Sequence, residues 1–271
     1  MNHRTTTSRR THCHKLSGGV MEDADPPLVI ESELRITVNN THLATVSILP
    51  EMTHEFITGY LFTQNLIDSL DDIESMTIHK STASVQIRQP IDLSPEGRQS
   101  GLNGRKTDMR NVSLPRITAD LKVKPSVVST AFDRLFESAD TYEETEGVHA
   151  AGIFTTQAEP LCIVEDIDRH NCLDKAIGWA LLNGVDTSIC LFAITSRITS
   201  EMTAKICRSG IPFAATRTAV TEQSVAIAKA CGMTLAGFVK DTDERDEQAG
   251  ETRPGHKPLM KVYTGIERVS D

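Results

Sequence analysis

The sequence predicts an α/β protein in which a small β-rich unit precedes a larger layered unit. Between residues 27 and 88, short alternating apolar runs surround one helical pattern. Residues 89–125 are rich in proline, glycine and charge and show little periodicity. From residue 126 onwards, apolar runs typical of strands alternate with patterns typical of helices. Such alternation is typical of an α/β layer, so we expect a largely parallel sheet in the second unit.

The first unit is predicted to hold four strands and one helix. Apolar runs at 27–38 and 43–49 flank Asn39-Asn40, which favours a hairpin turn. Thr53 is a candidate N-cap for a helix carrying apolar residues at helical spacing. Residues 73–79 and 83–88 read as two more strands. Residues 27–88 are therefore taken as one β-rich domain.

Two other segments lack such patterns. Residues 89–125 are too long for an ordinary connection, so we interpret them as a flexible loop and domain boundary. Residues 1–26 begin with Arg, Thr and His and contain no apolar stretch of a secretory signal. His12-Cys13-His14 is a compositional hint of metal binding, but a disordered tail explains the same residues, and no metal site is predicted.

The second unit is predicted to cover residues 126–271. The expected elements, in order, are a helix at 126–138, strands at 148–156 and 160–166, a helix around Trp179, a strand at 188–195, a helix ending at Gly210, a strand at 211–216, a helix from Thr221 to Gly232, a strand at 233–239 and a last strand at 259–265. The acidic stretch 241–258 is predicted to be a solvated loop.

Composition excludes several function classes. The net charge of −9 argues against a general nucleic-acid binder, which would carry a basic face. The longest apolar runs fall short of the ~18 residues that a membrane span needs. The six cysteines are scattered, without a C-x-x-C pair, and favour reduced thiols in the cytoplasm.

Several catalytic motifs are missing from the sequence. It contains neither a G-x-G-x-x-G nor a G-x-x-x-x-G-K-[ST] phosphate loop, no H-E-x-x-H and no G-x-S-x-G. His149 is followed by two alanines, and no P-C-x-x-C is present, which argues against the zinc site of a deaminase.

Three strand-to-helix junctions carry polar residues that suit an anionic ligand. Ligands of open α/β sheets bind at the carboxyl ends of strands, where helix N-termini offer free N–H groups. The candidate binding residues are Arg169, His170 and Asn171 at the first junction, Ser196 and Arg197 at the second, Arg217 at the third, and His149 at a strand start. Structural roles are also open. Asp168 or Asn171 fits a helix cap, Glu201 and Lys205 fit a surface i,i+4 pair, and His149 fits a core histidine.

The motifs together resemble the FdhD family of formate dehydrogenase accessory sulfurtransferases. The stretches "TEGVHAAGIF", "VEDIDRHNCLDKAIGWALL", "SRITSEMTAKICRSGIP", "MTLAGFVK" and "KVYT" carry the resemblance over roughly residues 28–270. It implies a cytidine-deaminase-like C-terminal domain without zinc, and a dimer that binds the molybdenum bis-guanine-dinucleotide cofactor. It also implies a cysteine desulfurase and formate dehydrogenase as partners, and cofactor contacts at Phe238, Val239 and Lys240.

The sequence departs from this family where sulfur would be carried. The family's C-G-x-C-G loop reads "SGLNG" here, with Ser100 and Asn103 at the two cysteine positions. A serine hydroxyl cannot form a persulfide or take part in thiolate exchange. Asp168 also replaces a glycine and adds negative charge to the first junction.

Three functions are consistent with these residues. The first is an accessory protein that binds the cofactor and, if active, passes sulfur to it. The second is a non-catalytic cofactor chaperone, or a paralogue that has lost sulfur transfer. The third is a nucleotide-processing α/β enzyme with His149 or His170 as a base.

Overall fold

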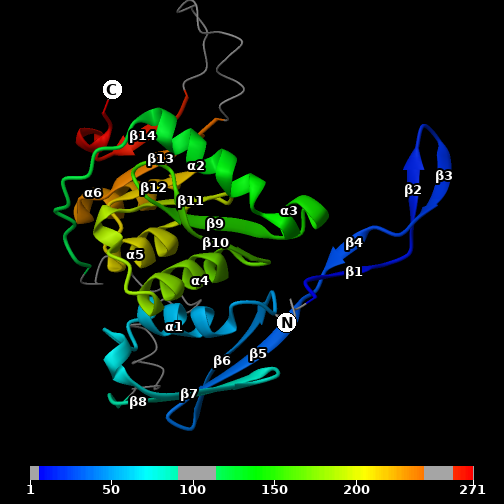
Figure 1. Ribbon diagram of the computed structural model, residues 1–271, viewed down its shortest axis with the longest axis horizontal. Helices are drawn as coiled ribbons and strands as arrows, with labels where there is room; N and C mark the ends of the chain where they lie inside the picture. The colour runs from blue at the N-terminus through cyan, green and yellow to red at the C-terminus, as the bar shows by residue number, and fades with distance from the viewer. Residues whose placement is uncertain (1–5, 91–113, 241–258, 271) are drawn as a thin grey trace, which may run out of the picture.

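The computed structural model describes residues 6–90, 114–240 and 259–270. The protein is a mixed α/β molecule in which two sheets lie on either side of a helical layer (Figure 1). The loop positions Ser100 and Asn103 and the acidic stretch 241–258 lie outside the described residues.

The smaller unit is a four-stranded sheet covered by one helix. Its strands are β5 (Ser32–Val38), β6 (Thr41–Ile48), β7 (Ile73–His79) and β8 (Thr82–Ile87), in the order β6-β5-β8-β7. Asn39 and Asn40 both have positive φ, as the turn of a two-residue hairpin requires, so the predicted hairpin is confirmed. The covering helix is α1 (Thr53–Thr63). Its N-cap is Met52, in the left-handed region, so the predicted cap at Thr53 is wrong by one residue.

The larger unit contains a six-stranded sheet in the order β10-β9-β11-β12-β13-β14. The strands are β9 (His149–Phe154), β10 (Pro160–Asp166), β11 (Leu191–Ile194), β12 (Phe213–Thr216), β13 (Thr234–Gly237) and β14 (Lys261–Thr264). Only the β11–β12 and β12–β13 pairs are parallel, so the expectation of a largely parallel sheet is wrong. The connection between β9 and β10 is too short to cross over, which forces an antiparallel pair.

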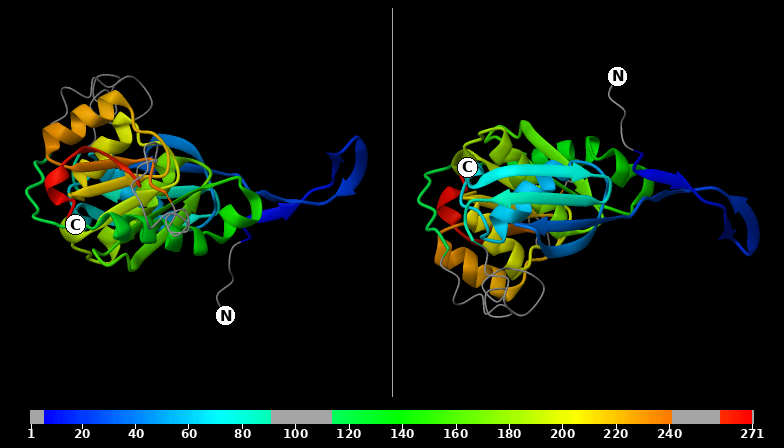
Figure 2. Two further views of the ribbon diagram at one scale, coloured as in Figure 1. Left: turned by 90° about the horizontal axis from the view of Figure 1, so that it is seen from above. Right: turned by 90° about the horizontal axis from the view of Figure 1, so that it is seen from below.

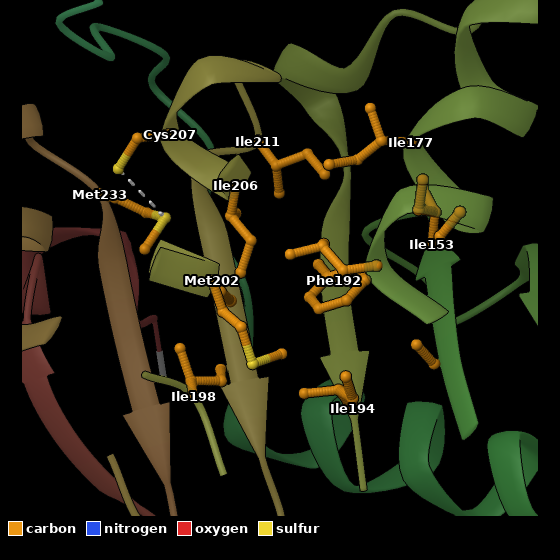
Figure 3. Close-up of a cluster of buried hydrophobic side chains, with 14 of the residues drawn as sticks. Ile153, Ile177, Phe192, Ile194, Ile198, Met202, Ile206, Cys207, Ile211 and Met233 are labelled. Atoms are coloured by element: carbon orange, nitrogen blue, oxygen red, sulfur yellow. Dashed lines mark hydrogen bonds between the residues drawn. The ribbon is translucent and has the colours of Figure 1, made fainter. Parts of the chain in front are cut away.

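Helices cover both faces of this sheet. On one face lie α4 (Arg169–Leu182), α5 (Ser200–Arg208) and α6 (Glu222–Cys231), and on the other lies α2 (Pro125–Glu137), with α3 (Asp140–Thr145) after it. Successive side chains of β11 point to opposite faces of the sheet and pack into two different hydrophobic cores. Phe192 packs with α4 and α5 in the cluster of Figure 3, and Leu191 packs with α2. No helix within the described ranges is long and apolar enough to span a membrane.

Residues 114–124, predicted to be part of the flexible loop, pack on the larger unit. Ile117 joins the core beneath α6, and its N–H donates to the carbonyl oxygen of Cys231. Val123 forms a bridge with Val269. The larger unit therefore begins before residue 126.

The two units meet where α1 lies against α4. A Cβ atom at Gly178 of α4 would overlap the carbonyl oxygen of Glu55, and one at Gly59 of α1 would overlap the carbonyl oxygen of Asp174. The absence of a side chain at both glycines lets the two helix backbones approach closely. The helix that begins at the predicted ligand junction is α4, and the same helix packs the smaller unit against the larger one.

The N-terminal residues form an arm that projects from the body (Figures 1 and 2). The arm comprises β1 (Ser8–Arg10), β2 (Cys13–Ser17), β3 (Val20–Ala24) and β4 (Pro27–Val29), paired as β1–β4 and β2–β3. The sequence predicted a disordered tail over residues 1–26, whereas the structure shows paired strands here. The turn is formed by Gly18 and Gly19, both with positive φ.

Candidate functional site

A cavity of about 750 Å³ lies between the two units, at the N-terminus of α4. It is lined from the smaller unit by residues of β6 and α1, and from the larger unit by the starts of α4 and α5. The polar lining side chains are Glu31, Ser47, Tyr60, Gln64, Asp168, Arg169, His170, Asn171, Asp174, Glu201 and Lys205. Three residues predicted at the first junction, Arg169, His170 and Asn171, therefore meet in one cavity.

The start of α4 is capped by its own carboxylate. Asp168 is the N-cap residue, and its Oδ1 accepts a hydrogen bond of 2.7 Å from the N–H of His170. A negative group at this position interacts favourably with the helix dipole. Asp168 thus takes one of the N–H groups that a bound phosphate would otherwise use, and adds a negative charge to the cavity wall.

Beneath the cavity, Asp166 and Lys175 form a fully buried ion pair, with 2.7 Å between Nζ and Oδ2. The Asp166 carboxylate also accepts from the N–H of Leu49 in the smaller unit, at 3.2 Å. The Lys175 ammonium donates to the carbonyl oxygens of Leu49 and Glu165. Because these bonds reach across the interface, the pair ties the smaller unit to the larger one.

Asn171 takes part in the same network. Its Nδ2 donates to the carbonyl oxygen of Ser47 at 2.8 Å and to Oδ1 of Asp166 at 2.9 Å. With only 7 % of its surface exposed, Asn171 presents little of its side chain to the cavity. A direct cofactor contact by Asn171 stays a prediction, but the amide nitrogen is already engaged.

A second buried pair forms part of the cavity wall. The Lys205 ammonium donates to both carboxylate oxygens of Asp174, at 2.9 and 2.7 Å, and the Thr63 hydroxyl donates to the same carboxylate. Burial raises the pKa of Asp174, although Lys205 acts in the opposite direction. The surface pair suggested for Glu201 and Lys205 is therefore wrong, because Lys205 is buried and bonded to Asp174. The signal that could have found it is spacing: Lys205 comes three residues after Met202 and directly before Ile206, on the apolar side of an amphipathic helix.

The two candidate histidines are uncharged near neutral pH. Burial, helped by the nearby Lys205 ammonium, lowers the pKa of His170 to about 4. Burial and then the Arg169 guanidinium lower the pKa of His149, which lies opposite Asp166 in the β9–β10 pair. Neither imidazole supplies positive charge for an anion at neutral pH. Each can donate or accept a hydrogen bond as a neutral ring.

The Arg169 guanidinium provides positive charge at the N-terminus of α4. Its Nε is buried and has no hydrogen-bond partner within the described part of the chain. Buried polar groups of native proteins are normally paired, so an orphaned Nε–H on a residue that lines the cavity indicates an acceptor outside the described chain. An anionic oxygen is the acceptor that a guanidinium binds most strongly.

The remaining predicted residues lie along the same sheet edge, outside this cavity. These residues follow the carboxyl ends of the parallel strands: Ser196 and Arg197 come after β11, Arg217 after β12, and Phe238, Val239 and Lys240 after β13. Phe238 has φ of 56° and is 42 % exposed, with the Lys261 ammonium 4.5 Å from its ring centre. Val239 is buried, and the Arg217 guanidinium stacks 5.1 Å from the Phe136 ring.

Strand order places His149 and the α4 start on the same edge as these residues. The start of β9 lies beside the end of β11, since Thr195 N–H donates to the carbonyl oxygen of Ala150. Neighbouring strands lie about 4.8 Å apart, so β9 and β13 are about 15 Å apart across the edge. The sheet therefore gathers the predicted residues into two groups on one edge.

Sulfur chemistry has little support from the thiols. All six cysteines fall within the described residues, and five are buried, leaving Cys13 exposed. Burial raises the pKa of Cys162 to about 12 and that of Cys190 to about 11. Burial also raises the pKa of Cys172, whose thiol donates to the carbonyl oxygen of His149. These three protonated, enclosed thiols are unsuited to accept a persulfide. Cys231 differs, because a hydrogen bond from the Cys207 thiol lowers its pKa, but its side chain is buried as well.

Comparison with known proteins agrees with this fold and motif pattern. A family model described as the FdhD/NarQ family matches residues 29–270. A sulfur carrier protein FdhD from Methanothermobacter thermautotrophicus is 29 % identical over 214 residues, covering 79 % of this chain and 86 % of that protein. One from Nocardia farcinica is 27 % identical, covering 97 % of this chain and 95 % of that protein.

A solved structure supports the fold over the whole length. The crystal structure of a proposed formate dehydrogenase accessory protein from Desulfotalea psychrophila superposes with a TM-score of 0.76 at 23 % identity. The match covers 98 % of this chain and 100 % of the other. On the extent of the family match, this chain belongs to the FdhD/NarQ family.

Proposed function

We propose that this chain is a formate dehydrogenase accessory protein that binds the molybdenum bis-guanine-dinucleotide cofactor as cargo. The observation that carries the proposal is the buried, unpartnered Nε of Arg169 at the cavity. A dinucleotide cofactor is rich in phosphate oxygens, which are the acceptors that this guanidinium lacks. Its relatives are named as FdhD sulfur carriers, which agrees with a role in the same process.

The extended sheet edge suits a ligand of this size. One phosphate group would bind at Arg169, and the rest of the ligand would extend along the ends of β11–β13 toward Arg197, Arg217 and Lys240. The exposed ring of Phe238 offers a surface on which a base can stack. The two groups of predicted residues then act on two parts of one ligand.

Guanosine diphosphate is a suitable probe for this site. We expect the wild-type chain to bind it in calorimetric titration and Arg169→Gln to weaken binding about tenfold or more, because a charge-assisted bond is lost. Arg134→Gln is the matched control, since Arg134 is paired with Glu159 away from the cavity. If the wild type does not bind the nucleotide, or if Arg169→Gln binds as well as wild type, the proposed site is refuted.

A second function, binding without sulfur transfer, is favoured by the cysteines. Ser100 and Asn103 replace the family's loop cysteines, and the five buried thiols are inaccessible. Incubation with a cysteine desulfurase and cysteine, followed by mass spectrometry, should show no added sulfur on these five. Added sulfur on any buried thiol would support a carrier role and contradict the chaperone.

A nucleotide-processing enzyme with a histidine base is disfavoured. A general base works best with a pKa near the working pH, whereas the pKa of His170 is about 4 and that of His149 is also lowered. Hydrolysis of the bound nucleotide would revive this alternative.

The remaining expectations follow from family membership. We propose a cysteine desulfurase and formate dehydrogenase as partners, a homodimer, and a cytoplasmic location. We also propose that the larger unit has the cytidine-deaminase-like arrangement without zinc. The mixed six-stranded sheet, with α4, α5 and α6 on one face, is compatible with that arrangement.

A further inference from the structure

One face of the N-terminal arm carries two histidines opposite two aspartates. His14 lies directly opposite Asp23 in the β2–β3 pair. The same register continues into the β1–β4 pair, where Arg10 faces Pro27, so His12 faces Asp25. Residues two apart on a strand share a face, so the four side chains form one cross-strand group.

The ligand atoms of this group already lie close together. The distance from His14 Nδ1 to Asp23 Oδ1 is 3.0 Å, from His12 Nδ1 to Asp25 Oδ1 3.5 Å, and from His12 Nε2 to Asp23 Oδ1 3.9 Å. One ligand atom each from His12, His14 and Asp23 lies within 4.8 Å of the others. Four ligands at about 2.0–2.2 Å from a tetrahedral ion would be about 3.4 Å apart. Side-chain rotations that shorten these distances by about 1–1.5 Å would close the three-residue set of His12, His14 and Asp23. Asp25, whose Oδ1 lies 3.5 Å from His12 Nδ1, is the candidate for the fourth ligand and would need a larger rotation.

We propose that this face of the arm binds a divalent transition-metal ion, with zinc the best match, through His12, His14, Asp23 and Asp25. Imidazole nitrogen together with carboxylate oxygen suits zinc, whereas calcium and magnesium prefer oxygen ligands alone. Cys13 lies between the two histidines and points to the opposite face, so its thiol is not a ligand.

The strands β2 and β3 of the arm have no hydrophobic core that would hold them together. Every residue of β2 is exposed, as are four of the five residues of β3. A two-stranded ribbon with no core is marginally stable in water, and exposed ion pairs add little. A metal ion bound to both strands would link them, because the free energy of metal binding then also stabilises the fold.

The test is titration of the full chain, without an affinity tag, with Zn²⁺ in competition with a chromogenic chelator. We expect one Zn²⁺ per chain, with affinity reduced about tenfold or more in His12→Gln and in His14→Gln. His42→Gln is the matched control, since His42 is an exposed histidine on the body. Cys13→Ser should bind as wild type, and X-ray absorption should show nitrogen and oxygen ligands without sulfur.

Hydrogen exchange gives an independent readout of the same site. Zn²⁺ should increase the protection of amides in residues 13–17 and 20–24, and His14→Gln should abolish this increase. The proposal is overturned if no Zn²⁺ binds at micromolar concentration or if both histidine variants bind as wild type. Loss of binding in Cys13→Ser would also overturn it, because the thiol would then be a ligand.

Discussion

The imidazole of His170 lies beside a buried lysine at the cavity wall, and its titration should affect stability. Burial and the Lys205 ammonium hold its pKa at about 4, against an ordinary value of 6.5. Glu201 lies 3.9 Å from its Nε2, and Asp168 and Arg169 are its other charged neighbours. Between these two pH values the unfolded chain binds the proton and the folded chain does not.

Stability should therefore fall as the pH drops from about 6.5 to about 4, by about 2–3 kcal/mol from this group. His170→Gln removes the group from both states, so the variant should lose less stability than wild type over this range. Urea unfolding at several pH values measures the difference, and His79→Gln, at an exposed position, is the control. Equal pH dependence in wild type and His170→Gln would show that His170 is protonated equally in both states.

At the scale of secondary structure, the sequence predicts the elements with clear end signals. Thr221 caps α6 through a bond from the Ser224 N–H, and Gly232 ends that helix in the left-handed region, both as predicted. Strand direction was missed because a short apolar run looks the same in either direction. The helix α3 was missed because only one of its six residues is buried, which leaves no apolar face to detect.

The contact between α1 and α4 gives a prediction at this scale. Gly178→Ala would gain about 1 kcal/mol of helix propensity, but the new Cβ would overlap the carbonyl oxygen of Glu55. Because the obstacle is backbone, the two helices must separate, which costs about 1–3 kcal/mol or more. We therefore expect a net loss in the free energy of unfolding. The control is Gln223→Ala, at an exposed position of α6, which should change the free energy of unfolding by less than about 0.5 kcal/mol. A Gly178→Ala variant more stable than wild type would contradict the close contact.

At the scale of the whole molecule, the candidate site exists only where the two units meet. The junction residues could be predicted from one stretch of sequence, because strand ends and helix starts are local features. The residues that these junction residues bond to could not be predicted, because they lie far away in the sequence. The backbone amide of Leu49 is 117 residues from Asp166, and Ser47 is 124 residues from Asn171. Part of the motif that resembles a ligand site thus holds the two units together, which only the folded structure reveals.

This interface should make the two units unfold together. Trp179, the only tryptophan, lies on α4 against the larger core, while far-ultraviolet circular dichroism reports both units. We expect the two signals to change at the same denaturant concentration in wild type.

Lys175→Met should lower the free energy of unfolding by about 3–5 kcal/mol, because the buried Asp166 carboxylate loses its partner. Lys122→Met, which removes an exposed pair with Asp120 and an exposed bond to the carbonyl oxygen of Glu267, should lower it by only about 1 kcal/mol or less. Loss of dichroism before the tryptophan signal changes would mean that the smaller unit unfolds independently and that the buried pair does not couple the two.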